Sequence, residues 1–137
     1  VFQELLAKKL GLAVEVPPLN GVANAVGAAL TRTTSHLALT ANTARGKLSV
    51  PMLGIFRSIG RGFSLQDATD EARKLLVEDL AKAGITMDAA DIQITQADAF
   101  NMVEGSYTSG KNIRVVAQVK PAVVARLTGE TTLVQAV

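Results

Sequence analysis

The 137-residue sequence contains no cysteine and a single histidine, His36. The absence of cysteine excludes disulfide-stabilised scaffolds, thiolate catalysis, Cys-ligated zinc and iron–sulfur clusters. A single histidine removes most histidine-based metal sites as well. We therefore expect no metal centre, and no residue of the sequence is assigned a catalytic role.

Aromatic residues make up only 4% of the chain, and tryptophan is absent. The four phenylalanines and one tyrosine are dispersed, without the aromatic and basic pattern of nucleic-acid-binding sheets. The formal net charge of +2 is too small to attract a polyanion. No apolar run approaches the roughly 18 residues needed to cross a bilayer. We expect a cytoplasmic protein with neither a nucleic-acid nor a membrane partner.

Hydrophobic residues account for 48% of the sequence and charged residues for 19%, which is typical of a folded protein with an apolar core. The length allows one compact domain, or a domain with an attached piece of another. The chain begins with Val1 inside an apparent helix, and we expect it to be a fragment or a processed product.

The first 33 residues have the pattern of an α-β-α unit. Apolar residues at helical spacing predict a short amphipathic helix over residues 2–10. Ala13 to Val16 reads as a short strand, closed by two prolines. Asn20 is positioned to cap a second helix, rich in alanine and glycine, from Gly21 to about Arg32. We expect this unit to belong to a larger α/β sheet.

A β-hairpin and a loop are expected next. Alternating residues from His36 to Asn42 and the short run Leu48–Val50 predict two antiparallel strands. His36 falls on the polar side of its strand and is interpreted as a surface or structural residue. The segment from Gly54 to Gly62 is rich in glycine and arginine and reads as a loop.

A long amphipathic helix from Leu65 to Ala83 is the strongest prediction. Ser64 and Asp67 have the spacing of a capping box, and Gly84 provides a stop. An apolar stripe runs along one face, and charged residues occupy the other. We interpret the carboxylate pairs of that face as solvated surface: Asp70/Glu71 and Glu78/Asp79.

Two further strands complete the pattern, from Ile92 to about Val103 and from Ile113 to Val119, with Gly105–Gly110 as their hairpin loop. The order β-β-α-β-β predicts an α+β fold, a two-layer structure in which one long helix packs on an antiparallel sheet. We expect two domains, residues 1–33 and residues 34–137.

The glycine–arginine loop is a candidate anion or partner site. Gly60 and Gly62 would expose backbone N–H groups just before the long helix, and Arg57 and Arg61 would add positive charge. Asp67 at the same helix end would repel an anion. The alternative is a loop that contacts the remainder of a larger protein.

The segment from Val14 to Leu30 contains the pattern P-x-x-x-x-A-N-A-x-G-A-A. At these residues the sequence resembles the end of the ATPase domain in the actin/Hsp70/sugar-kinase superfamily. More narrowly, it resembles the hydantoinase/oxoprolinase family, including hydantoinase A-type subunits, with the related diol dehydratase reactivases close behind. The resemblance covers about an eighth of the chain, 17 of 137 residues.

This resemblance implies the last strand-to-helix connection of a nucleotide-binding domain, near the adenosine part of ATP. The matching positions are Gly21, Ala23, Asn24 and Gly27. ATP and magnesium are implied for the parent protein, which would couple ATP to opening a cyclic amide such as a hydantoin or 5-oxoproline. The chain lacks the part that would hold the phosphate-binding loops and the magnesium-binding carboxylates. We therefore expect it to bind no cofactor alone and to be inactive alone.

The expected partners are the remainder of the parent chain and a second hydantoinase-type subunit, with self-association left open. Two other functions remain open at this point. One is a non-enzymatic module for protein binding or assembly, and the other is part of a reactivase-like chaperone ATPase.

Overall fold

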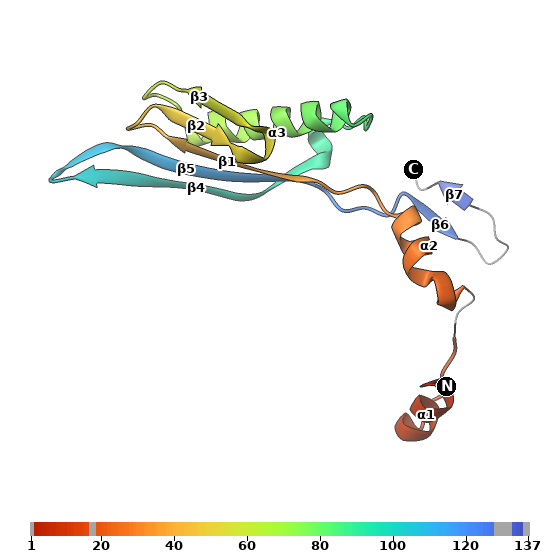
Figure 1. Cartoon of the computed structure of the whole chain (residues 1–137). Coiled ribbons are helices and arrows are strands. Elements are labelled where there is room, and N and C mark those ends of the chain that lie inside the picture. The colour runs from red at the N-terminus through yellow and green to blue at the C-terminus, as the bar shows by residue number, and fades with distance from the viewer. Residues whose placement is uncertain (1, 17–18, 128–132, 136–137) are drawn as a thin grey trace. The chain divides into compact units, whose positions relative to one another are not determined.

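The computed structural model describes residues 2–16, 19–127 and 133–135, and the chain divides into two compact units (Figure 1). Residues 33–121 form the larger unit, and residues 1–32 together with 122–137 form the smaller one. The segment after residue 121, which the sequence-based division joined to the α+β domain, thus groups with the amino-terminal segment.

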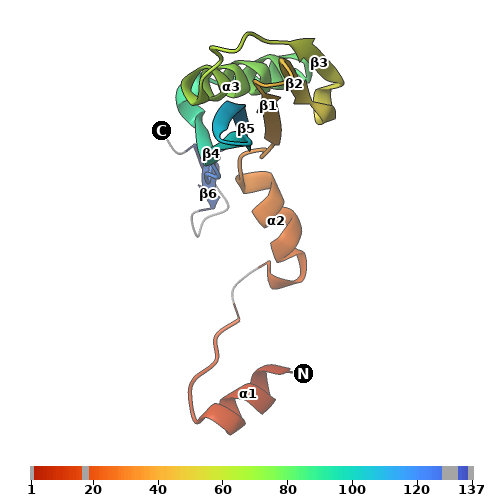
Figure 2. The same ribbon diagram turned by 90° about the vertical axis from the view of Figure 1, so that its left-hand side faces the viewer.

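The larger unit has the α+β architecture that the sequence predicts. Its five-stranded antiparallel sheet has the order β3-β2-β1-β5-β4. The long helix α3 (Leu65–Lys82) lies along one face of this sheet, as Figures 1 and 2 show, and packs against β5, β1 and β4. The strands are β1 (His36–Asn42), β2 (Lys47–Val50), β3 (Ile55–Ser58), β4 (Ile92–Glu104) and β5 (Tyr107–Val119).

Alternation along the central strands places the core between the sheet and α3. In β1, and in β5 from Ile113 onward, every second residue is buried, and Leu39 stands opposite Val115 in the register. Since successive side chains of a strand point to opposite faces, this pattern leaves one face for the helix and one for polar residues. The helix contributes the buried residues Ala68, Ala72, Leu76 and Leu80.

The ends of α3 follow the predicted signals. Ser64 and Asp67 form a complete capping box, and Gly84 adopts a φ of 78°, which favours glycine. The last helical residue is Lys82, and Ala83 is the C-cap, so the helix is one residue shorter than predicted.

One strand was missed, because the segment from Gly54 to Gly62 is not entirely a loop. Its residues Ile55–Ser58 form β3, which pairs antiparallel with β2 after the single 3₁₀ turn η2 (Pro51–Leu53). Three of the four β3 residues are exposed, so the strand shows no alternation that the sequence could have revealed.

The second hairpin is longer than predicted. β5 begins at Tyr107, so the loop expected over Gly105–Gly110 shrinks to Gly105 and Ser106. Asn112 of β5 pairs with Asn42, the last residue of β1. Between Asn112 and the hairpin turn, the ladder of β5 continues with β4 alone. The register shifts between Met102 and Val103, which marks a bulge in this distal part of the hairpin.

The smaller unit contains α1 (Phe2–Leu10), the 3₁₀ turn η1 (Asn20–Val22), α2 (Ala23–Leu30) and the strand pair β6 (Ala125–Leu127) and β7 (Leu133–Gln135). The strand predicted over Ala13–Val16 is absent, since no described segment pairs with it. The cap predicted at Asn20 is also wrong. Leu19 takes a left-handed φ of 65°, the chain enters η1 at Asn20, and no side chain caps the start of η1 or α2.

Candidate functional site

The residues that carry the family resemblance lie on η1 and α2. Gly21 is in the 3₁₀ turn, whereas Ala23, Asn24 and Gly27 are on α2. Asn24 and Gly27 are three residues apart and Ala23 and Gly27 are four apart, so these three share one side of the helix. All four residues are exposed. The structure therefore brings three of the four predicted residues together on a single accessible surface.

The two glycines of this segment have open space around them. A Cβ built at Gly21 or Gly27 would meet no atom within 4 Å, and neither has a positive φ. Within the described part of the chain, neither local conformation nor packing requires glycine at these positions. The side-chain amide of Asn24 forms no hydrogen bond with the described residues. A ligand or another polypeptide segment could therefore approach this surface closely.

The helices around this segment have no buried residue. Neither α1 nor α2 buries a side chain, and Phe2 is 77% exposed. Large apolar side chains normally lose contact with water when a domain folds. The exposed apolar residues of this region are Phe2, Leu5, Leu6, Leu10, Leu12, Val16, Leu19 and Val22.

Gly21, Asn24 and Gly27 combine steric room with an amide that can both donate and accept hydrogen bonds. Magnesium binding would need, in addition, a set of carboxylate ligands. Among the described residues, no group of three or more His, Cys, Asp or Glu side chains is arranged to hold a metal ion.

The four residues of the glycine–arginine site have different surroundings. Arg57 lies on β3, and its Nη2 forms an ion pair with Glu71 Oε1 of α3 at 2.8 Å. Gly60 is exposed between β3 and α3, and a Cβ there would meet nothing within 4 Å. Arg61 and Gly62 line a cavity together with residues of β5. Arg57 is thus engaged by α3, whereas Arg61 and Gly62 face a cavity, and the anion or partner site stays a prediction.

The cavity that Arg61 and Gly62 line has a volume of about 380 Å³, and we call it the hairpin cavity. Three segments far apart in sequence form its wall: the turn after β1, the approach to α3 and the first part of β5. Its lining residues are Thr43, Arg61, Gly62, Phe63, Ser64, Thr108, Ser109, Gly110 and Lys111. The sequence places Thr108, Ser109 and Gly110 in a hairpin loop, and it identifies neither Lys111 nor Thr43 as a candidate site residue.

Two hydrogen bonds join two walls of the hairpin cavity. The Thr43 N–H donates to the Lys111 carbonyl at 2.9 Å, and the Lys111 N–H donates to the Thr43 hydroxyl oxygen at 2.7 Å. Thr43 is only 3% exposed and is a buried polar residue of the core region. These hydrogen bonds fix β5 against the turn after β1 and hold Lys111 at the cavity.

The start of α3 closes one side of the hairpin cavity and is already capped. The Ser64 N–H and hydroxyl each donate to Asp67 Oδ2 at 2.8 Å, while the Asp67 N–H donates to the Ser64 hydroxyl oxygen at 3.1 Å. The backbone N–H of Ser64, followed by its hydroxyl, lowers the pKa of the Asp67 carboxyl. Asp67 thus keeps its negative charge, and the capping box satisfies the N–H groups of Ser64 and Asp67.

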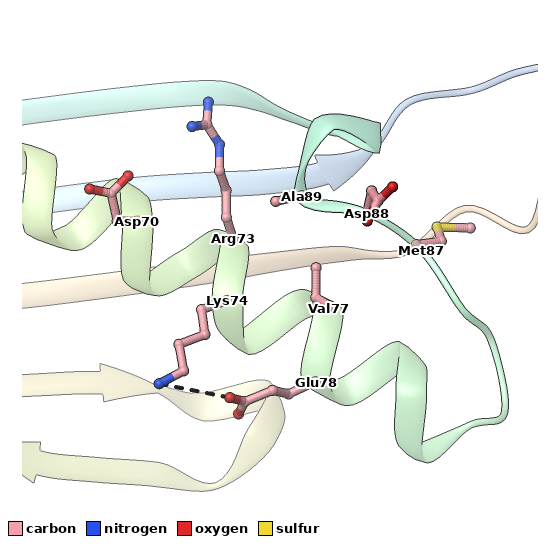
Figure 3. Close-up of a pocket in the computed structure, with 8 residues that line it drawn as sticks. All are labelled: Asp70, Arg73, Lys74, Val77, Glu78, Met87, Asp88 and Ala89. Atoms are coloured by element: carbon pink, nitrogen blue, oxygen red, sulfur yellow. Dashed lines mark ion pairs between the residues drawn. The ribbon is translucent and has the colours of Figure 1, made fainter.

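A second depression runs along α3 toward the 3₁₀ turn η3 (Ala89–Asp91), with a volume of about 520 Å³ (Figure 3). It carries charges of both signs, and Lys74 and Glu78 form a 3.9 Å ion pair. Arg73 Nε is buried without a hydrogen-bond partner among the described residues. The lining residues are Asp70, Arg73, Lys74, Val77, Glu78, Met87, Asp88 and Ala89.

The other titratable residues considered in the sequence do not gather into a site. His36 is exposed at the start of β1. Asp70 and Glu78 are exposed, in agreement with the solvated face predicted for α3, but the neighbouring Glu71 is the partner of Arg57. Among the described residues these carboxylates belong to ion pairs or to the surface.

Comparison with protein-family models, with curated proteins and with solved structures finds no match for this chain. No helix in the described part of the chain is long and apolar enough to cross a membrane. Function therefore has to be inferred from the residues and their geometry.

Proposed function

We propose that this chain is the carboxy-terminal portion of a hydantoinase/oxoprolinase-like ATP-dependent hydrolase that opens a cyclic amide, such as a hydantoin or 5-oxoproline. The observation that carries this proposal is the surface of α2. There Asn24 and the open glycine Gly27 lie side by side, within the sequence pattern that resembles the end of an actin-like ATPase domain.

In this proposal Gly21 and Gly27 let the nucleoside part of ATP approach the backbone, since no side chain stands in the way. Asn24 supplies an amide for polar contact with the adenosine, and Ala23 keeps the shared face of α2 small. ATP supplies the free energy for ring opening. The phosphate-binding loops and the magnesium ligands belong to the remainder of the parent protein.

The exposed apolar side chains of α1 and of Leu12, Val16, Leu19 and Val22 fit the same proposal. In the parent protein they pack against the rest of the ATPase domain, which removes them from water. The α+β unit, which has its own core, is the carboxy-terminal appendage of that enzyme. The isolated chain neither hydrolyses ATP nor opens a cyclic amide.

An assembly module is the second candidate, and the same exposed apolar residues favour it, because a partner protein could cover them equally well. In that case α2 is a packing surface for another chain, and a second hydantoinase-type subunit is one such partner. A reactivase-like chaperone ATPase shares the nucleotide motif but acts on another enzyme.

Calorimetry with ATP and magnesium tests whether the chain is only part of a nucleotide site. The isolated chain is expected to show no tight, specific binding. In the full-length enzyme, Asn24→Ala is expected to raise the KM for ATP, whereas the matched control Asn112→Ala, on β5, leaves it unchanged. Micromolar binding by the isolated chain would contradict the partial site. A coding sequence without phosphate-loop motifs upstream would favour the assembly module.

A further inference from the structure

The hairpin cavity combines two cations without partners. Arg61 and Lys111 line it from different segments, and neither forms an ion pair or a side-chain hydrogen bond with the described residues. None of the nine lining residues is an aspartate or a glutamate. Asp67, at the start of α3, is hydrogen-bonded to Ser64 of the cavity wall. The two positive side chains of the lining therefore favour an anion.

The cavity also holds a buried hydroxyl whose own proton has no acceptor. The Thr43 oxygen accepts the Lys111 N–H, but within the described chain its hydroxyl hydrogen is donated to nothing. A buried donor needs an acceptor. Because Thr43 lines the cavity, a ligand bound there can accept this hydrogen. Thr108 adds a second unengaged hydroxyl at the same wall.

The other hydroxyls of the cavity are already committed. Ser109 donates to the Met102 carbonyl at 3.1 Å, and Ser64 donates to Asp67. The capping box likewise occupies the N–H groups of Ser64 and Asp67 at the start of α3. Four side chains of the lining are thus free to bind a ligand in the cavity, namely those of Thr43, Arg61, Thr108 and Lys111.

We propose that the hairpin cavity binds the phosphoryl group of a small phosphorylated molecule. A guanidinium, an ammonium and two hydroxyls on separate segments can surround a tetrahedral oxyanion, for which arginine and lysine are the usual protein partners. The volume of about 380 Å³ leaves room for an organic part beside the phosphoryl group, and Phe63 offers an apolar wall to it. This inference does not depend on the proposed function, since every residue lies in the α+β unit.

Inorganic phosphate is the probe that tests this site, in an NMR titration of the whole chain at constant ionic strength. The amides of Gly62 and of residues 108–111 are expected to shift and to saturate. Arg61→Gln or Lys111→Gln is expected to weaken phosphate binding about tenfold or more, because each removes a charge-assisted contact. The control Arg57→Gln should bind as the wild type does, since Glu71 holds that arginine away from the cavity.

Thr43 gives a second, independent variant pair. Thr43→Ser keeps the hydroxyl and is expected to retain phosphate binding, whereas Thr43→Val removes it and weakens binding. Because Thr43→Val also removes the acceptor of the Lys111 N–H, its fold is verified by the amide spectrum before titration.

Three results would overturn the assignment. The first is an equal response to chloride, which would mark an adventitious ion only. The second is unchanged phosphate affinity in the Arg61→Gln/Lys111→Gln double variant. The third is a phosphoserine peptide that binds far more tightly than glycerol phosphate, because a phosphoprotein would then replace the small molecule as the ligand.

Discussion

Gly110 of β5 lies so close to Ala44, in the turn after β1, that a Cβ at position 110 would stand 2.6 Å from the Ala44 backbone nitrogen. We predict that Gly110→Ala lowers the free energy of unfolding by about 1–3 kcal/mol, because the added methyl must push two backbones apart. The same displacement strains the hydrogen bonds between Thr43 and Lys111. Equilibrium denaturation in urea measures the change.

Gly60→Ala is the matched control for this prediction. A Cβ at Gly60 would meet nothing within 4 Å, and this glycine has no positive φ. The free energy of unfolding of the Gly60→Ala variant is expected to stay within about 0.5 kcal/mol of that of the wild type. Equal losses in both variants would mean that the close approach to Ala44 is not the cause.

The capping box at the start of α3 gives a second prediction. Ser64→Ala removes the hydroxyl that accepts the Asp67 N–H, and it should lower the free energy of unfolding by about 1 kcal/mol. Ser58→Ala, at the exposed end of β3, is the control and should be nearly neutral. Thermal unfolding of the three proteins compares them, and a Ser64→Ala protein as stable as the Ser58→Ala protein would refute the cap.

Asp67 makes the stability dependent on pH in a defined direction. Hydrogen bonds from Ser64 lower its pKa in the folded state from the usual 3.8. A carboxyl with a lowered pKa stabilises the fold above its unfolded pKa, and this contribution is lost as the pH falls through the folded pKa. We predict that Asp67→Asn is less stable than the wild type at pH 7. Denaturation between pH 2 and pH 7 should show the two converging below about pH 4. A gap that stays constant would contradict the assignment.

The sequence contained enough information for α3, for β1 and for the second half of β5, because each has a periodic apolar face that ends at capping or turn residues. Leu37, Leu39 and Val115 alternate with polar residues in sequence and are buried in the structure. The strand β3 could not be predicted in this way. Only Ile55 of its four residues is partly buried, and the pairing with β2 defines it.

The candidate sites were predictable only in part, for a related reason. Arg61 and Gly62 were identified from their position just before a helix. Lys111 and Thr43 join them only through the register of β1 and β5 and through the close approach at Gly110, which depend on tertiary structure. The predicted strand over Ala13–Val16 failed because local alternation does not supply a neighbouring strand.

The ion pair between Arg57 and Glu71 joins β3 to α3 at 2.8 Å, and the two side chains are 46% and 21% exposed. We predict a coupling energy of up to about 1 kcal/mol from a double-mutant cycle with Arg57→Gln and Glu71→Gln. The coupling should shrink in 1 M salt, because exposed charges are screened. The more exposed pair Lys74–Glu78 is the comparison and should couple more weakly. A salt-independent coupling would argue against an ion pair.

Only the α+β unit has a buried core among the described residues, so the two units should respond differently to truncation of an apolar side chain. Leu76 of α3 is fully buried, whereas Leu5 of α1 is 55% exposed. Leu76→Ala is expected to lower the free energy of unfolding by about 2–5 kcal/mol, because it removes buried contacts and leaves a cavity. Leu5→Ala should change it by no more than about 0.5 kcal/mol.

Denaturation of the isolated chain, followed by far-UV circular dichroism, measures the free energy of unfolding of both variants under the same conditions. If Leu5→Ala destabilised the isolated chain as much as Leu76→Ala does, α1 would have to be part of a core, and its apolar face would not be free for another polypeptide. If Leu5→Ala were neutral in the isolated chain but destabilising in the proposed full-length enzyme, the apolar face of α1 would be buried there against the rest of the parent protein.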